Sequence, residues 1–223
     1  MIAGISFGNG VFYHNKNVIA CAEVKNGVIH TWAEKMGMRT LCKMWWRIVS
    51  SLPWYYHILH LLMLLYVFFP VLGEFDPLWL VVYGAGFHFI FPKRLKQFHG
   101  AEHKVFSYYG EVKPENWETI QQASIINRGC STNMVTFFFA FFLPTICFFQ
   151  LWIAIVIGLV GIGICNLLSK YAPRLIEPLY RVSGFLQYYL TTKEPERIHM
   201  DTAIRSYALF IYFRNMEEAN DSL

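Results

Sequence analysis

Charged side chains are scarce in this chain. They make up 15% of its 223 residues, whereas soluble globular domains contain about 25%. Hydrophobic residues make up 55% and aromatic residues 18%. This composition excludes an intrinsically disordered chain, a coiled coil and a collagen-like fibre. The formal net charge of +4 is also too weak for the basic surface that nucleic-acid binding needs, so nucleic acid is excluded as a partner.

Cysteine is also scarce, and its number is odd. The chain has 5 cysteines, so they cannot all pair within one chain. Some fall inside the apolar runs described next, and the others lie on the side expected to face the cytoplasm, where thiols stay reduced. A disulfide framework is therefore excluded. The positions are Cys21, Cys42, Cys130, Cys147 and Cys165.

Long uncharged runs account for the hydrophobic composition. Apolar residues dominate Leu52–Leu72 and Pro77–Phe91, and Met134–Leu168 contains no charged residue. Because a membrane-spanning helix needs only about 20 apolar residues, the last run is too long for one straight span, and we divide it near Gln150. The sequence therefore predicts a mainly α-helical, polytopic membrane bundle of about four spans.

Basic residues gather next to these runs. They precede the first run and follow the second and the last, and such loops stay in the cytoplasm. Both termini are therefore expected in the cytoplasm, in a multi-pass protein of the cell membrane. No apolar h-region of a cleavable signal peptide precedes residue 30. The basic residues are Lys35, Arg39, Lys43, Arg47, Lys93, Arg94, Lys96, Lys170, Arg174 and Arg181.

The parts outside the spans carry shorter patterns. Strands at 18–24 and 28–32 flank Asn26-Gly27, which favours a type I′ hairpin, and 4–13 adds a third strand to a small sheet. A helix is expected at 92–109 and an amphipathic surface helix at 201–213. The expected organisation is a β-rich segment with a lead-in helix (1–50), a transmembrane hairpin (51–92), a cytoplasmic helical segment (93–133), a second transmembrane hairpin (134–169) and a cytoplasmic C-terminal segment (170–223).

The helix expected at 92–109 contains a metal-binding pattern. His99-Gly100-Ala101-Glu102-His103 matches the inverted zincin pattern H-x-x-E-H. Residues four apart share a helix face, so His99 and His103 can bind one divalent metal ion, and zinc is the expected ion. Glu102 can join them as a ligand or act as a general base. In the second role, Glu102→Gln is expected to abolish turnover while the metal stays bound.

The setting of this pattern allows a second interpretation. Glu102 falls near the middle of an apolar stripe, where a carboxylate is costly unless it is paired, metal-bound or protonated. The alternative is an interfacial helix whose histidines meet lipid headgroups and whose Glu102 pairs with Lys96, Arg128 or another cation. The stripe consists of Leu95, Phe98, Val105, Phe106 and Tyr109.

A complete metal site needs a third ligand. Cys130 could supply a thiolate, as a zinc ligand or as a nucleophile. Acidic residues further along the chain are the other candidates, and they are Glu111, Glu115, Glu118 and Glu177. Histidines within the predicted spans are functional hypotheses by default. Interfacial solvation is the alternative for His57 and His60, and His88 is a candidate to face the metal site.

These residues resemble a known family. Phe98-His99-Gly100-Ala101-Glu102-His103-Lys104, followed by Pro114-Glu115-Asn116 and a cysteine-containing turn, resembles the bacterial YqhQ family of membrane proteins. The segment Gly4–His30 and the blocks Gly184-Phe185-Leu186-Gln187 and Leu190–Pro195 are similar to further parts of that family. The resemblance implies a polytopic inner-membrane protein with a metal centre at His99, Glu102 and His103. It also makes Cys130 the counterpart of the family's cysteine.

The chain departs from the family pattern next to this cysteine. The family usually shows His-Pro-Arg-Cys-Gly-Thr-Ser, whereas this chain reads Asn127-Arg128-Gly129-Cys130-Ser131-Thr132-Asn133. Asn127 is a poor substitute for a metal-binding histidine. A divergent, non-catalytic member is therefore an alternative to an active one.

Three classes of function follow from these patterns. The leading hypothesis is a membrane-embedded, metal-dependent hydrolase with its site at the cytoplasmic membrane face. The alternative is a non-catalytic membrane factor that assists the assembly, regulation or quality control of other membrane proteins, with the pattern as a structural zinc clip. A transporter or channel ranks last because no inverted repeat is visible. The expected partners are the lipid bilayer, another membrane protein, a lipid-linked substrate and, in a homo-oligomer, a second copy of the chain.

Overall fold

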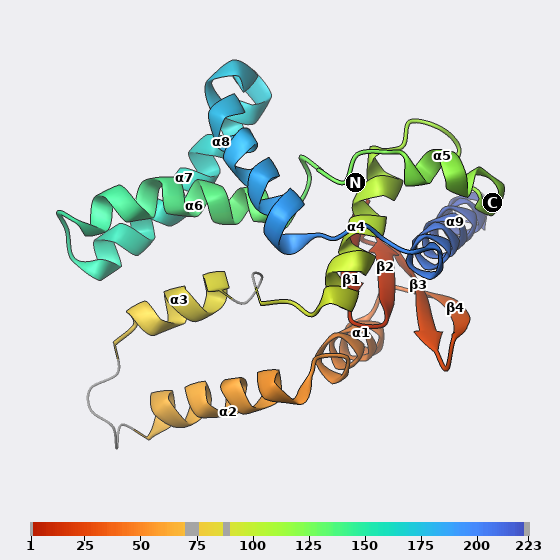
Figure 1. Cartoon of the computed structure of the whole chain (residues 1–223), viewed down its shortest axis with the longest axis horizontal. Helices are drawn as coiled ribbons and strands as arrows, with labels where there is room; N and C mark the ends of the chain where they lie inside the picture. The colour runs from red at the N-terminus through yellow and green to blue at the C-terminus, as the bar shows by residue number, and fades with distance from the viewer. Residues whose placement is uncertain (1, 70–75, 87–89, 221–223) are drawn as a thin grey trace. The chain divides into compact units, whose positions relative to one another are not determined.

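The structure is a computed structural model of the chain, and it describes residues 2–69, 76–86 and 90–220 (Figure 1). The chain forms two compact units. The first unit contains Met1–Leu72, Phe91–Ile125 and Thr192–Leu223, and the second contains Gly73–Ile90 and Ile126–Thr191. Each unit has its own buried core.

An antiparallel sheet of four strands opens the first unit. Its strands follow chain order and are β1 (Ala3–Phe7), β2 (Gly10–His14), β3 (Val18–Lys25) and β4 (Val28–Lys35). Asn26 and Gly27 join β3 to β4 with φ values of 51° and 79°, which confirms the predicted type I′ hairpin. The stretch 4–13 was predicted as one strand, but it folds back on itself and supplies most of β1 and β2.

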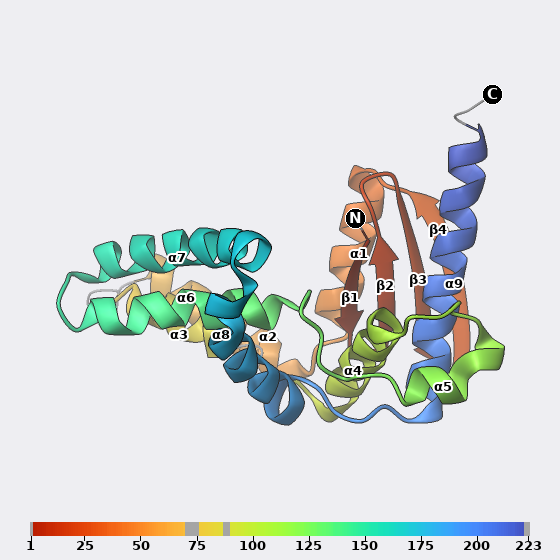
Figure 2. The same cartoon turned by 90° about the horizontal axis from the view of Figure 1, so that it is seen from above.

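Helices cover both faces of this sheet (Figure 2). Helix α1 (Met38–Ser50) packs on one face, over Phe12, Ile19 and Cys21. Helices α4 (Lys93–Ser107) and α9 (Arg197–Asn220) pack on the other face. Because successive side chains of a strand point to opposite faces, β2 and β3 are buried on both sides. The small predicted sheet is therefore the centre of a three-layer core.

The amphipathic helix predicted near the C-terminus is confirmed. The segment 201–213 forms the middle of α9, and its apolar side lies on the sheet rather than against solvent. Met200, Ala203, Ile204 and Phe210 are each 0% exposed. The first strands and the last helix of the chain thus share one core (Figure 1).

The second unit is helical in the part that the structure describes. It contains α3 (Leu78–Gly86), α6 (Ser131–Ile146), α7 (Leu151–Tyr171), α8 (Pro173–Leu186) and the π-helical turn η3 (Gln187–Thr191). Helices α6 and α7 form a hairpin, with Gln150 as the N-cap of α7, so the division predicted near Gln150 is confirmed. A Cβ on Gly158 or Gly161 would meet a phenylalanine of α6 within 2.6 Å, so these glycines permit the close packing.

The four-span bundle is not confirmed. Among the described residues, α7 is the one helix long and apolar enough to cross a membrane. Helices α1 and α2 (Trp54–Phe68) pass the same test only together, and they are bent by 107° at their junction. Helix α6 is a shorter apolar helix. Most of the turn predicted at 73–76, and His88, lie outside the described residues.

Candidate metal centre

Helix α4 carries the H-x-x-E-H pattern. It starts after Pro92, whose fixed φ suits the position just before a helix, and it runs to Ser107, close to the predicted bounds. Tyr109, the last residue of the predicted stripe, lies beyond the end of α4 and is exposed. Leu95, Phe98 and Val105 of the predicted stripe are buried, and Glu102 and His103 are buried with them, at 5% and 1% exposure. The predicted burial of a carboxylate within the stripe is therefore confirmed.

The ring of His103 is fixed by a backbone carbonyl. Its Nδ1 lies 2.6 Å from the oxygen of Ile125. Because a carbonyl can only accept, Nδ1 must carry a proton, and in the neutral imidazole Nε2 then holds a lone pair. That Nε2 is buried and has no hydrogen-bond partner among the described residues. Metal-binding histidines are held in this way, with one nitrogen donating to a carbonyl and the other left for the metal.

The ring of His99 faces a carboxylate. Its Nδ1 lies 3.5 Å from Oε2 of Glu102 and 3.5 Å from the hydroxyl of Ser6, and that hydroxyl donates to Glu102 Oε2. Burial raises the pKa of the Glu102 carboxyl, but the hydrogen bond with His99, the electrostatic interaction with both imidazoles and the hydrogen bond from Ser6 together lower it more. The pKa of Glu102 therefore lies below its ordinary value, and Glu102 is an ionised partner for His99. The predicted alternatives, Lys96 and Arg128, are not among these partners.

A glycine in strand β1 allows this strand to approach the Glu102 carboxylate closely. A Cβ on Gly4 would lie 2.5 Å from Oε1 of Glu102 and 2.7 Å from the ring of Phe106. Only a residue without a side chain lets β1 approach α4 closely enough for Ser6 to bond Glu102. Ser6 is not among the residues predicted from the sequence. The three glycines at 4, 8 and 10 mark such a close approach, but they do not name the residue that it brings in.

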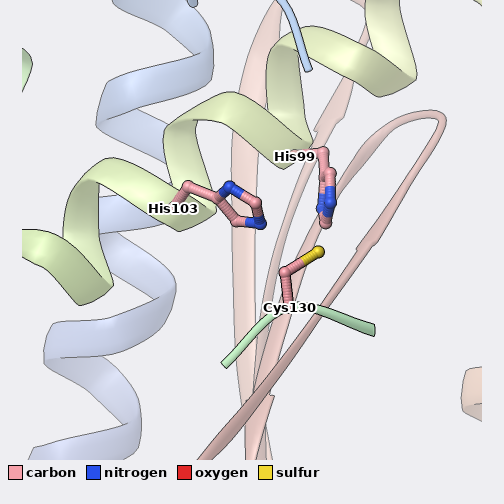
Figure 3. A group of neighbouring side chains, drawn as sticks. All are labelled: His99, His103 and Cys130. Atoms are coloured by element: carbon pink, nitrogen blue, oxygen red, sulfur yellow. The ribbon is translucent and has the colours of Figure 1, made fainter. Parts of the chain in front are cut away.

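Three side chains offer metal-binding atoms close together. One ligand atom each from His99, His103 and Cys130 lies within 4.8 Å of the others. Figure 3 shows the two imidazoles on α4 with the sulfur of Cys130 directed toward them. This group could bind a metal ion. Cys130 lies a few residues after Ile125 in the chain, and the carbonyl of Ile125 holds the ring of His103.

The other candidate ligands do not join this group. Glu177 pairs with Arg128 at 2.7 Å, and Glu111, Glu115 and Glu118 are exposed. Asn127, which stands where the family has a histidine, accepts a hydrogen bond from the backbone of Gly129 at 2.7 Å. Its side chain therefore shapes the turn before the cysteine.

Two sequence blocks that are far apart in the chain meet on α4. The backbone N–H of Lys193 donates to the oxygen of Lys96 at 3.0 Å, and the carbonyl of Lys193 lies so close to Gly100 that a Cβ there would collide with it. Lys104 is buried, and its Nζ donates to the oxygens of Gln121 at 2.6 Å and Ala123 at 3.2 Å. These contacts hold the chain on both sides of α4, including the loop that presents the carbonyl of Ile125.

Replacing Lys104 tests whether that loop positions His103. Lys104→Met keeps the length of the side chain but removes both hydrogen bonds to the loop carbonyls, together with the ion pair of Lys104 with the exposed Glu194 at 3.2 Å. Because loss of the groups that orient a metal-binding histidine lowers affinity by about 10-fold or more, we expect a zinc affinity about 10-fold lower by chelator competition. Lys113→Met is the matched control, since Lys113 is exposed and pairs with the exposed Glu111. Equal affinities in the two variants would contradict this positioning role.

Two comparisons with known proteins find similar sequences. The model of the family described as "Protein of unknown function (DUF1385)" matches residues 78–211, more than half of the chain. "Uncharacterized protein YqhQ" of Bacillus subtilis (strain 168) is 28% identical over 142 residues, which are 57% of this chain and 44% of that protein. The chain thus matches less than half the length of this relative. No solved structure matches. The chain belongs to the DUF1385 family of proteins of unknown function.

Proposed function

We propose that this protein is a membrane-embedded, metal-dependent hydrolase that binds one zinc ion through His99, His103 and Cys130. The observation that carries the proposal is the hydrogen bonding of the His103 ring. Its Nδ1 donates to the carbonyl oxygen of Ile125, and its Nε2 is buried without a hydrogen-bond partner among the described residues. A buried nitrogen without a partner is costly in a folded protein. A bound cation would remove that cost.

The donor atoms fit zinc. Two imidazole nitrogens and one thiolate are ligands that zinc prefers, and three protein ligands leave one position open, as in catalytic zinc sites. A zinc ion bound there would supply Lewis acidity and lower the pKa of a water molecule at the open position. Structural zinc sites are closed by four protein ligands. Among the residues that the structure describes, the group contains three possible ligands. Three ligands rather than four favour the hydrolase over the non-catalytic membrane factor.

Glu102 is the partner of His99 in this proposal. Its carboxylate faces Nδ1 of His99, so it holds the ring in the tautomer whose other nitrogen can bind metal. The hydroxyl of Ser6 donates a hydrogen bond to the same carboxylate oxygen and so restrains the rotation of the Glu102 side chain. The role of Glu102 as a general base stays a prediction, because it needs contact with a substrate.

The membrane part of the proposal rests on exposed apolar surface. Leu61 and Leu62 of α2, and Leu159 and Val160 of α7, each expose more than half of their surface. Trp45 and Trp46 on α1 are exposed next to basic residues of the same helix, and tryptophan is enriched at the membrane–water interface. We propose a multi-pass protein with cytoplasmic termini and the metal site at the cytoplasmic face. A lipid-linked compound or another membrane protein would be its substrate.

One purification tests both parts of this proposal. Membranes from cells expressing the full chain are washed with alkaline carbonate and then extracted in detergent without a chelator. We expect the protein to remain in the washed membranes and to carry about one zinc per chain by elemental mass spectrometry. The His99→Ala/His103→Ala variant should carry less than about one tenth of that amount, because both imidazole ligands are lost.

The matched control is His57→Ala/His60→Ala, which removes two exposed histidines of α2. Equal zinc in wild type and the α4 variant would refute the site, and release by carbonate would refute the membrane part alone. X-ray absorption at the zinc edge then distinguishes the two functions. One sulfur, two imidazoles and one solvent ligand support the hydrolase, whereas four protein ligands support the non-catalytic factor.

A further inference from the structure

The second unit contains a cavity at the N-terminal end of α6. The cavity has a volume of about 460 Å³ and is lined by α8, η3, the turn that precedes α6 and Asn133 in the first turn of α6. Its floor is polar, because Asn133 and Gln187 are both buried. The side chain of Gln187 accepts from the backbone N–H of Asn127 at 2.8 Å and donates to Ser183 at 3.2 Å. Hydrogen bonds within the unit therefore hold this floor in place.

Two arginines and one acid lie in the wall of the cavity. The guanidinium of Arg128 pairs with Glu177 at 2.7 Å and lies 4.9 Å from the ring centre of Tyr180. Arg181 follows Glu177 by one helical turn and is exposed, and no ion pair of Arg181 is found among the described residues. The wall thus has one net positive charge. A guanidinium offers a planar fork of donors that matches the oxygens of a phosphate.

One side of the same helix is apolar. Leu175, Val182 and Phe185 are exposed at 71%, 51% and 60%, and Phe185 also lines the cavity, so this apolar side adjoins it. Arg174 and Arg181 follow the neighbouring side, seven residues apart. A helix with an apolar stripe beside a basic one lies in the interface of a membrane, with its basic groups at the level of the lipid headgroups.

The connection to α7 puts this helix at the end of a candidate membrane span. Helix α7 ends at Tyr171 with Lys170 in its last turn, and α8 begins at Pro173. A tyrosine and a lysine at the end of an apolar helix are typical of the membrane–water interface. Glu177, the first residue of α8 that lines the cavity, lies about one helical turn after Pro173. The wall of the cavity therefore begins close in the chain to this end of α7.

We propose that this cavity binds the phosphate-bearing headgroup of an anionic membrane lipid, with Arg181 and Arg128 as its anion-binding groups. The acyl chains would lie along the apolar side of α8 defined by Leu175, Val182 and Phe185. This inference rests on the membrane location proposed above but not on the metal site. It names a lipid as the ligand, because a free phosphate would leave that apolar side uncovered.

Native mass spectrometry of the detergent-purified full chain tests this proposal. The protein is titrated with phosphatidylglycerol, with zwitterionic phosphatidylcholine as the comparison lipid and glycerol phosphate as the soluble headgroup. We expect saturable binding of phosphatidylglycerol, with a dissociation constant raised about tenfold in Arg181→Gln, because one charged hydrogen-bond donor group is lost. Glycerol phosphate should bind far more weakly than the lipid.

Arg205→Gln is the matched control, since it removes the same charge from an exposed position of α9 in the first unit. It should bind phosphatidylglycerol as the wild type does. Equal weakening in both variants would show an unspecific charge effect, and equal binding of phosphatidylcholine or of glycerol phosphate would show that an anionic lipid is not the ligand. Each of these results overturns the proposal. An unchanged zinc content and thermal midpoint of Arg181→Gln verify that the variant is folded and separate this test from that of the metal site.

Discussion

Replacing Cys130 by serine is expected to lower the zinc affinity of this protein about 100-fold. The free energy of zinc binding to small four-ligand sites is about 10–16 kcal/mol, so one ligand contributes roughly 3 kcal/mol, which corresponds to about a factor of 100. Serine keeps the shape of the side chain but replaces the thiolate by a hydroxyl, which is a poor zinc ligand. Competition with a chromophoric chelator in detergent measures the change directly.

Two variants control this experiment. Cys42→Ser and Cys147→Ser each remove an exposed free cysteine and should leave the affinity unchanged. Cys130→His should recover part of the lost affinity, since imidazole is also a zinc ligand. A Cys130→Ser variant with wild-type affinity would exclude the thiolate from the site and leave the two histidines of α4 without their proposed third ligand.

Replacing Glu102 by glutamine is expected to lower zinc affinity by about 10–100-fold, the usual effect of losing the group that orients a metal-binding histidine. The amide keeps the size of the carboxylate but lacks its charge, so it holds the proton on Nδ1 of His99 less well. Ser6 can still donate to the amide oxygen, which preserves the contact between β1 and α4. Chelator competition gives the affinity, and a thermal midpoint close to that of the wild type verifies the fold.

This prediction distinguishes two roles for Glu102. If the carboxylate positions His99, metal affinity falls and Glu102→Asp restores only part of it, because the shorter side chain reaches less far. If Glu102 is instead a general base that makes no contribution to His99, Glu102→Gln binds zinc as tightly as the wild type. Unchanged affinity would therefore remove the positioning role and favour the general-base prediction.

Elements that depend on neighbouring residues were predictable from the sequence. Asn26-Gly27 specifies its turn because both positions need positive φ. Helix α4 begins after Pro92, and α7 begins after Gln150. The pairing of His99 with His103 belongs to the same class, since two residues four apart on a helix must share a face. In each case, the information lies within a few residues of the chain.

The number of spans and the place of the last helix were not predictable in this way. Hydropathy counts apolar residues but does not say where a helix bends, and the apolar stretch of α2 is separated from α1 by a turn at Pro53. The alternation of apolar residues along α9 indicates a buried side but not what covers it. That cover is a sheet made from the opposite end of the chain.

The sequence by itself determined which side chains of this protein can bind a metal, and only the tertiary structure decided which of their atoms are prepared to do so. Nδ1 of His103 is occupied by a carbonyl 22 residues away, and the carboxylate beside His99 is held by a serine 96 residues away from Glu102. Helical periodicity reports only on neighbours within one element. The hydrogen bonds that fix a tautomer come from whatever the fold brings alongside, and they exist only once the sheet, α4 and the loop at Ile125 have packed together.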